Sequence, residues 1–261
     1  MTAKSPLLLL HGVTMSAAAW ADVVSLLSDH YDVIAPTAAG HHGGPPLTGR
    51  ASVGALTDQI EGLLDARGLD RVHIAGNSLG GWMAIELARR DRALTVCAFS
   101  PAGFWTRGGS DETGATSRIR RMAALARVTR PVAPVALRAG FVRRLAMRDI
   151  AEHGERLTAA QAVTAARDTV NCSATSDLLA TTESVEPLHP LPCPITLAWS
   201  ANDRIFPPAI NGAIAQDRLP QAEFVLLPGV GHVPMIDDPA LCERLIRTST
   251  QRAGPQHSSP G

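Results

Sequence analysis

The sequence has 261 residues, with 24 basic and 24 acidic side chains and a hydrophobic fraction of 45%, which excludes disorder as its main state. A net charge of zero gives no reason to expect nucleic acid as a partner, and an aromatic fraction of 4% argues against stacking platforms for single strands. No apolar run is long enough for a membrane span or a signal-peptide core, so we expect no integral membrane segment and, by default, a cytoplasmic location.

Short apolar runs alternate with helical patterns along most of the chain, which indicates β-α units that fold into a parallel sheet. Strands are predicted at residues 6–10, 31–35, 71–75, 94–99, 195–199 and 223–227. Helices are predicted at residues 18–28, 53–66, 79–90, 208–216 and 239–248. We therefore expect an α/β fold with a mostly parallel sheet of about six strands and helices on both faces. The cysteines form no C-x-x-C pair, and we expect buried free thiols at Cys97, Cys172, Cys193 and Cys242.

The alternation stops between residues 105 and 189, where only helical signals occur, so this segment is predicted to be a helical cap inserted into the core. The core then comprises residues 1–104 and 190–252, and residues 253–261, rich in Gly, Pro and Ser, are expected to be a disordered tail.

Several signals inside this segment predict individual helices. Thr158 and Gln161 form a capping box, and Pro134 is suited to the first turn of a helix. Leu137, Phe141 and Leu145 form an apolar stripe at helical spacing.

The pentapeptide Gly76-Asn77-Ser78-Leu79-Gly80 matches G-x-S-x-G and lies directly between a predicted strand and a predicted helix, where a nucleophile elbow must lie. At such an elbow the serine takes a strained backbone conformation, and side chains at Gly76 and Gly80 would collide with the strand and helix. Ser78 is therefore the predicted nucleophile.

A serine hydroxyl needs a base to take its proton and an acid to orient that base. His232 follows the last predicted strand, at the carboxyl edge where ligands bind in open α/β sheets, and is the predicted base, with His11 as the second candidate. Asp203 follows the strand before it and is the predicted acid, because Asp237 and Asp238 come too soon after His232 to reach back easily.

On these residues the sequence resembles the α/β-hydrolase superfamily, in the capped branch that includes esterases, cofactor-free haloperoxidases and C–C bond hydrolases. His11-Gly12-Val13-Thr14 resembles its oxyanion-hole loop, Gly40-His41 its Gly-His after the second strand here, and Gly231-His232-Val233-Pro234 its histidine loop. The resemblance implies that the N–H groups of Val13 and Leu79 hold the oxyanion, with no cofactor and no metal.

Two departures from the family pattern stand out. The family usually opens with an antiparallel pair of strands, for which His11-Gly12 comes too early, so residues 31–35 should lie near an edge of a six-stranded sheet. We expect either a short, strongly twisted edge there or a homodimer contact. The second departure is Pro36-Thr37-Ala38-Ala39, where the family commonly has an acidic and a basic residue.

The resemblance also bears on the chemistry. Haloalkane dehalogenases and epoxide hydrolases of this superfamily have an aspartate where Ser78 stands, so hydrolysis of a small carboxylic ester or lactone through an acyl-enzyme on Ser78 is the expected reaction. C–C bond hydrolysis, cofactor-free perhydrolysis and a ligand-binding or receptor role without turnover remain alternatives. Trp105, Phe104 and Phe141, with His11, are candidates for lining the substrate pocket, against ordinary core packing.

Residues 118–148 contain nine arginines and no acid inside a neutral protein. Most such runs form solvated helix faces, and we expect these arginines mainly on the outer surface of the cap. An anionic substrate, an acidic partner or a membrane surface are the sharper alternatives.

Overall fold

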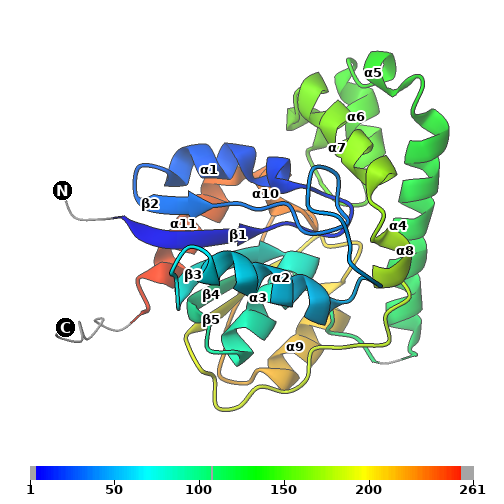
Figure 1. Ribbon diagram of the computed structural model, residues 1–261. Coiled ribbons are helices and arrows are strands. Elements are labelled where there is room, and N and C mark those ends of the chain that lie inside the picture. The colour runs from blue at the N-terminus through cyan, green and yellow to red at the C-terminus, as the bar shows by residue number, and fades with distance from the viewer. Residues whose placement is uncertain (1–3, 107, 254–261) are drawn as a thin grey trace.

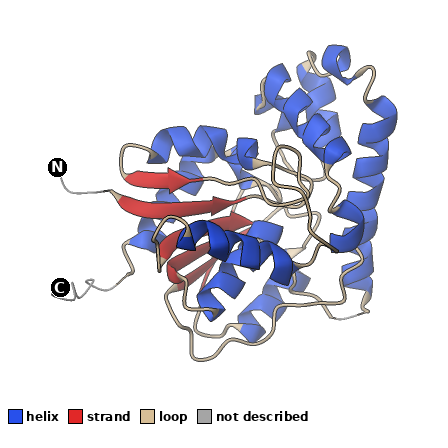
Figure 2. Cartoon of the chain, viewed as in Figure 1, coloured by secondary structure: helices blue, strands red, loops and turns tan. Residues whose placement is uncertain are grey.

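The central element is a sheet of six strands. The computed structural model describes residues 4–106 and 108–253, and Figure 2 shows the strands side by side with helices around them. Within these residues the strand order is β2-β1-β3-β4-β5-β6, and every neighbouring pair is parallel. The strands are β1 (Ser5–Leu10), β2 (Tyr31–Ile34), β3 (Val72–Asn77), β4 (Ala93–Phe99), β5 (Ile195–Ser200) and β6 (Glu223–Leu227). The six predicted strands are confirmed, each within two residues of its expected bounds.

Strand β2 forms one edge of the sheet, as predicted. It has four residues, and its only strand partner within the described residues is β1. Asp32 in this strand is exposed, and short length together with an exposed charge protects a sheet edge from pairing with another chain. A homodimer contact at β2 stays a prediction.

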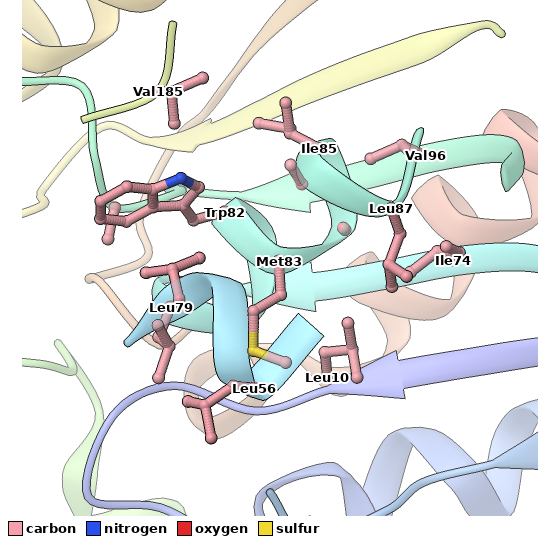
Figure 3. Packing of buried hydrophobic residues seen from close by; sticks show 14 of the residues in the cluster. Leu10, Leu56, Ile74, Leu79, Trp82, Met83, Ile85, Leu87, Val96 and Val185 are labelled. Atoms are coloured by element: carbon pink, nitrogen blue, oxygen red, sulfur yellow. The ribbon is translucent and has the colours of Figure 1, made fainter. Parts of the chain in front are cut away.

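Helices cover both faces of the sheet. They are α1 (Ala21–Leu27), α2 (Val53–Asp65), α3 (Leu79–Arg89), α9 (Ala213–Arg218) and α11 (Pro239–Thr250). Because side chains alternate along a strand, Leu8 and Leu10 of β1 pack with α2 and α3, whereas Leu7 and Leu9 pack with α1 and α11. Figure 3 shows the first of these layers, with Met83 of α3 between Leu56 of α2 and Leu10 of β1. A strand buried on both faces must be apolar throughout, which explains the run of leucines.

Two of the predicted helices, at residues 18–28 and 208–216, open with turns that are not α-helical. A 3-10 turn, η1 (Ala17–Trp20), precedes α1, and a π turn, η3 (Pro208–Gly212), precedes α9. The four-residue helix α10 (Pro234–Asp237) follows the histidine loop. All four cysteines are buried and free, as predicted.

The described residues of the inserted segment form helices and no strand. They are α4 (Ser110–Thr129), α5 (Ala133–Ala136), α6 (Gly140–Met147), the 3-10 turn η2 (Gly154–Arg156), α7 (Ala159–Asn171) and α8 (Thr175–Leu178). Figure 1 shows them grouped to one side of the sheet, beyond the carboxyl ends of its strands. The capping box of Thr158 and Gln161 and the place of Pro134 in the first turn of α5 are confirmed.

The predicted stripe of Leu137, Phe141 and Leu145 is wrong. Leu137 ends α5 and is buried, but α6 begins only at Gly140, so the three side chains do not share one helix. Phe141 and Leu145 are 77% and 59% exposed.

The extent of the cap and of the core stay predictions. Of the expected disordered tail, 253–261, only Ala253 lies within the described residues. No helix in the described ranges has both the length and the apolar character needed to cross a bilayer.

Candidate active site

Ser78 lies at a sharp turn between β3 and α3. Its backbone has φ 56° and ψ −116°, a conformation that costs a non-glycine residue about 1–3 kcal/mol. A Cβ at Gly76 would lie 2.2 Å from the carbonyl oxygen of Gly80, and a Cβ at Gly80 would lie 2.1 Å from the carbonyl oxygen of Leu10. These approaches to rigid backbone explain why both flanking positions are glycine, as predicted from the motif.

The predicted base and acid are hydrogen-bonded to each other. His232 Nδ1 lies 2.8 Å from Asp203 Oδ2, and both side chains are buried. Asp203 Oδ1 accepts the N–H groups of Ile205 and Phe206, each at 2.8 Å. A carboxylate can only accept, so Nδ1 carries the imidazole proton and Nε2 is left as a proton acceptor.

A buried asparagine, which the sequence did not single out, joins the elbow to the histidine loop. Asn77 Nδ2 donates to the carbonyl oxygens of Phe99, at 3.1 Å, and His232, at 2.9 Å. Asn77 occupies the variable position before the serine in G-x-S-x-G, so no pattern marks it. Its amide fixes the backbone of the predicted base relative to the predicted nucleophile.

Asp237 also positions the histidine loop, although it does not orient the imidazole. Its carboxylate accepts the N–H groups of Gly231 at 2.7 Å, His153 at 2.7 Å and Glu152 at 3.1 Å. It thereby ties the loop before His232 to the inserted helical segment. From the sequence, Asp237 was only a competitor of Asp203, because nothing local indicates these distant backbone partners.

Ser78 lines a small apolar cavity of about 40 Å³ beneath α4. The lining residues are Val13, Val53, Ser78, Leu79, Trp82, Ala102, Trp105, Ala115, Thr116, Ile119, Leu178, Leu179, Thr181 and Phe206. The structure thus brings together Ser78, Val13, Leu79 and Trp105 of the predicted site residues. The ring of Phe206 also packs edge-on against His232, with ring centroids 5.2 Å apart, so it connects the cavity to the imidazole.

Three of the predicted pocket residues do not line this cavity. Phe141 points to solvent on α6. Phe104 is a core residue, because its ring is 1% exposed and packs against Trp199 at 6.2 Å. His11 is held by backbone groups, as described below.

The predicted oxyanion-hole loop lies close against Ser78. A Cβ at Gly12 would lie 3.4 Å from Ser78 Cβ, so the backbone of the loop at Gly12 is in contact distance of the serine. Leu79 is the first residue of α3, where an N–H has no acceptor within the helix. Val13 of this loop and Leu79 at the start of α3 therefore line the same cavity as Ser78.

His11 is buried with both ring nitrogens bound to backbone. Nδ1–H donates to the carbonyl oxygen of Gly12 at 2.9 Å, and Nε2 accepts the N–H of Ala38 at 3.0 Å. Burial, and then the nearby His41 ring at 4.9 Å, lowers the pKa of His11 from 6.5 to about 3. His11 therefore supports the loop after β1 as a neutral imidazole and has no free nitrogen with which to act as the base.

This lowered pKa predicts an acid-sensitive fold. Between pH 6.5 and about 3 the unfolded chain binds a proton at His11 that the native state does not. The free energy of unfolding should therefore decrease as the pH is lowered through this range, by up to about 1.4 kcal/mol per pH unit from this residue. Urea unfolding of His11→Gln at pH 4 to 7 should show a shallower slope against pH than the wild type. His30→Gln, at an exposed histidine, is the matched control and should leave the slope unchanged. An unaltered slope in His11→Gln would contradict the assignment.

Comparison with known proteins agrees with this fold. Residues 7–245 match the profile described as the alpha/beta hydrolase family. The chain belongs to the alpha/beta hydrolase family.

Relatives and solved structures that are similar to this chain carry names of several activities. The chain is 32% identical over 208 residues to a protein named epoxide hydrolase EphH of Mycobacterium tuberculosis, covering 78% of this chain and 97% of the relative. It resembles a thermophilic esterase from Thermogutta terrifontis with a TM-score of 0.71 at 24% identity, over 96% of this chain and 91% of the other. It also resembles a meta-cleavage product hydrolase from Pseudomonas fluorescens with a TM-score of 0.74 at 19% identity, over 97% and 92%. These structural matches show the shared fold, and the family is one of hydrolases.

Proposed function

We propose that this protein is a serine hydrolase that cleaves small carboxylic esters or lactones through an acyl-enzyme on Ser78. One observation supports the proposal, the grouping of these residues around one apolar cavity. Ser78, at the strained elbow, lines this cavity together with Val13 and Leu79. Phe206, which also lines it, packs on His232, and His232 is hydrogen-bonded to Asp203.

In this mechanism His232 Nε2 takes the proton of the Ser78 hydroxyl as its oxygen attacks the ester carbonyl. Asp203 holds the Nδ1–H tautomer and stabilises the imidazolium that forms. The N–H groups of Val13 and Leu79 hold the developing oxyanion, and one such donor is worth about 3 to 4 kcal/mol in the transition state. The imidazolium then gives its proton to the leaving alcohol. A water repeats the sequence on the acyl-enzyme and releases the acid.

The size of the cavity favours a short acyl group. About 40 Å³ is far below the roughly 300–1,000 Å³ of pockets for drug-sized ligands. Its walls are apolar and include Trp82 and Trp105, packed edge to face at 5.4 Å. A longer acyl chain would have to displace residues of the cavity wall, which includes Ala115, Thr116 and Ile119 of α4.

Epoxide hydrolysis is the second candidate, because of the name of the 32% identical relative. Ring opening by a carboxylate gives an ester that water can cleave at its carbonyl carbon. Ring opening by a serine hydroxyl would give an ether, which has no carbonyl for water to attack. The serine at position 78 therefore favours acyl transfer over epoxide opening.

The test compares three substrates under identical conditions: p-nitrophenyl acetate, p-nitrophenyl octanoate and styrene oxide. We expect repeated turnover of the acetate, a kcat/KM for the octanoate at least about tenfold lower because the cavity is small, and no diol from styrene oxide. Diol formation without ester turnover would overturn the proposal in favour of epoxide hydrolysis. A single burst of one p-nitrophenol per chain, with no further release, would overturn it in favour of a receptor.

A further inference from the structure

The outer end of the inserted helical segment carries an unusual group of exposed apolar side chains. Six large hydrophobic residues within positions 125–145 are between 58% and 79% exposed: Leu125, Val128, Val132, Val135, Phe141 and Leu145. We call them, with the arginines between them, the cap-tip surface. Only three other large hydrophobic side chains in the described part of the chain are exposed. Exposed apolar residues scattered singly are ordinary, but such a concentration marks an interaction site.

Four of these residues lie on α4 and α5, at this end of the segment. Leu125 and Val128 are three residues apart on α4, which places them on one face of that helix. Val132 and Val135, also three residues apart, are the N-cap and the third residue of α5. Figure 1 shows α5 at the end of the helical segment farthest from α9. Apolar side chains on a helix normally pack on a core, whereas these four face solvent.

The same surface is strongly basic. Of the nine arginines in residues 118–148, seven are exposed, as the sequence predicted, and this stretch has no acid. Arg118 pairs with Asp149 at 3.6 Å and Arg144 with Glu155 at 4.0 Å. Three exposed arginines beside the apolar residues are in no ion pair within the described ranges: Arg127, Arg130 and Arg138.

We propose that the cap-tip surface binds anionic lipid bilayers peripherally. Apolar side chains flanked by guanidinium groups are what an interfacial helix presents to a membrane, because the first enter the acyl boundary and the second bind headgroup phosphates and carboxylates. A second copy of the chain fits less well, since a symmetric contact would oppose arginine to arginine. Nucleic acid would leave the valines and Phe141 against phosphates without burying them.

Helix α4 connects this surface to the candidate active site. Ala115, Thr116 and Ile119 in its first half line the cavity over Ser78, and Leu125 and Val128 in its second half belong to the cap-tip surface. Contact with a bilayer therefore acts on the helix that closes the cavity. We expect anionic vesicles to raise turnover of longer acyl esters, a consequence that rests on the proposed function, whereas the binding itself does not.

Sedimentation with vesicles tests the binding. Vesicles of phosphatidylcholine alone and of phosphatidylcholine with 30% phosphatidylglycerol serve as probes, at 50 and 500 mM salt. We expect at least about tenfold tighter binding to the anionic vesicles at low salt, and loss of this preference at high salt. Equal binding to both vesicles, or none, would overturn the proposal.

Variants locate the surface. Arg127→Glu with Arg130→Glu removes two basic groups and should weaken binding to anionic vesicles at least about 30-fold, because each arginine near the surface contributes roughly 1 kcal/mol. Val128→Glu with Val135→Glu should abolish binding to these vesicles, because it places charge where apolar side chains enter the acyl boundary. Arg67→Glu and Leu26→Glu, at an exposed arginine and an exposed leucine away from the cap-tip surface, are the matched controls and should bind as the wild type does.

Further readouts separate binding from folding, self-association and catalysis. Circular dichroism and acetate turnover without vesicles should be unchanged in both double variants, because neither changes a residue that lines the cavity. Ser78→Ala should bind vesicles normally. A wild-type protein that binds anionic vesicles but does not turn over p-nitrophenyl acetate would refute the proposed function and leave the binding proposal standing. A dimer in solution that the Val128→Glu, Val135→Glu variant dissociates, together with no vesicle binding, would assign the surface to a second copy instead.

Discussion

Ser78→Ala should lower kcat for p-nitrophenyl acetate by about 10⁴-fold or more, and His232→Ala should do the same. Without the serine oxygen no acyl-enzyme forms, and without the imidazole no group takes the hydroxyl proton. The double variant should be no slower than either single variant, because the residues act as a unit. Initial rates at saturating substrate measure all three.

Asp203→Asn should lower kcat nearly as much, and the hydrogen bonds of Asp203 explain why. If the asparagine oxygen keeps the N–H groups of Ile205 and Phe206, its NH₂ group must face His232 Nδ1. The imidazole then carries its proton on Nε2 and has no lone pair for Ser78. We expect a loss of about 10³- to 10⁴-fold in kcat with little change in stability.

Matched controls separate these losses from general damage. Ser25→Ala and His30→Ala change an exposed serine and an exposed histidine away from the cavity, and should retain wild-type rates. The inactive variants should unfold in urea near the wild-type midpoint. Retention of more than a tenth of the activity in Ser78→Ala would contradict the assignment.

Gly80→Ala should destabilise the protein by at least about 3 kcal/mol or prevent folding. The new Cβ would lie 2.1 Å from the carbonyl oxygen of Leu10 and 2.8 Å from that of His11. Both atoms are backbone, and Leu10 is in register with Gly76 between β1 and β3, so relief would require breaking that strand pair. Any folded fraction should also have lost activity, because the shift displaces the loop that carries Val13.

Gly62→Ala is the matched control for this variant. Gly62 lies in the interior of α2 and a Cβ there would meet nothing within 4 Å. Alanine should therefore stabilise the protein by about 0.5–1 kcal/mol, through a smaller loss of chain entropy on folding. Urea unfolding of both variants measures the difference. A Gly80→Ala protein as stable as the wild type would show that the close packing of β1 on α3 is not required.

The fold could be predicted from the sequence because its central strands are buried on both faces. Such strands must be continuously apolar, as Leu7 to Leu10 are, and a parallel sheet needs helices between them. The elbow was equally clear, since G-x-S-x-G falls between a strand and a helix, and the positive φ of Ser78 agrees with that interpretation. The order serine, aspartate, histidine then indicated three side chains at one edge of the sheet.

The supporting residues could not be predicted in the same way. Asn77 and Asp237 act through backbone groups 155 and up to 85 residues away, and nothing in their neighbourhood in the sequence records those partners. Phe141 was expected near the substrate because it is aromatic and lies in the inserted segment. The exposure of Phe141 depends on where α5 ends and α6 begins, and the helical spacing of apolar residues in the sequence does not reveal that boundary.

The location of the acyl group tests the central proposal most directly. The wild type is mixed with p-nitrophenyl acetate, quenched in acid within milliseconds, digested and analysed by mass spectrometry. We predict that the acetyl mass lies on the peptide containing Ser78, at Ser78 alone, and that it is absent from Ser78→Ala. Steady ester turnover with the acetyl group on another residue, or with no covalent species at any time, would contradict the proposal.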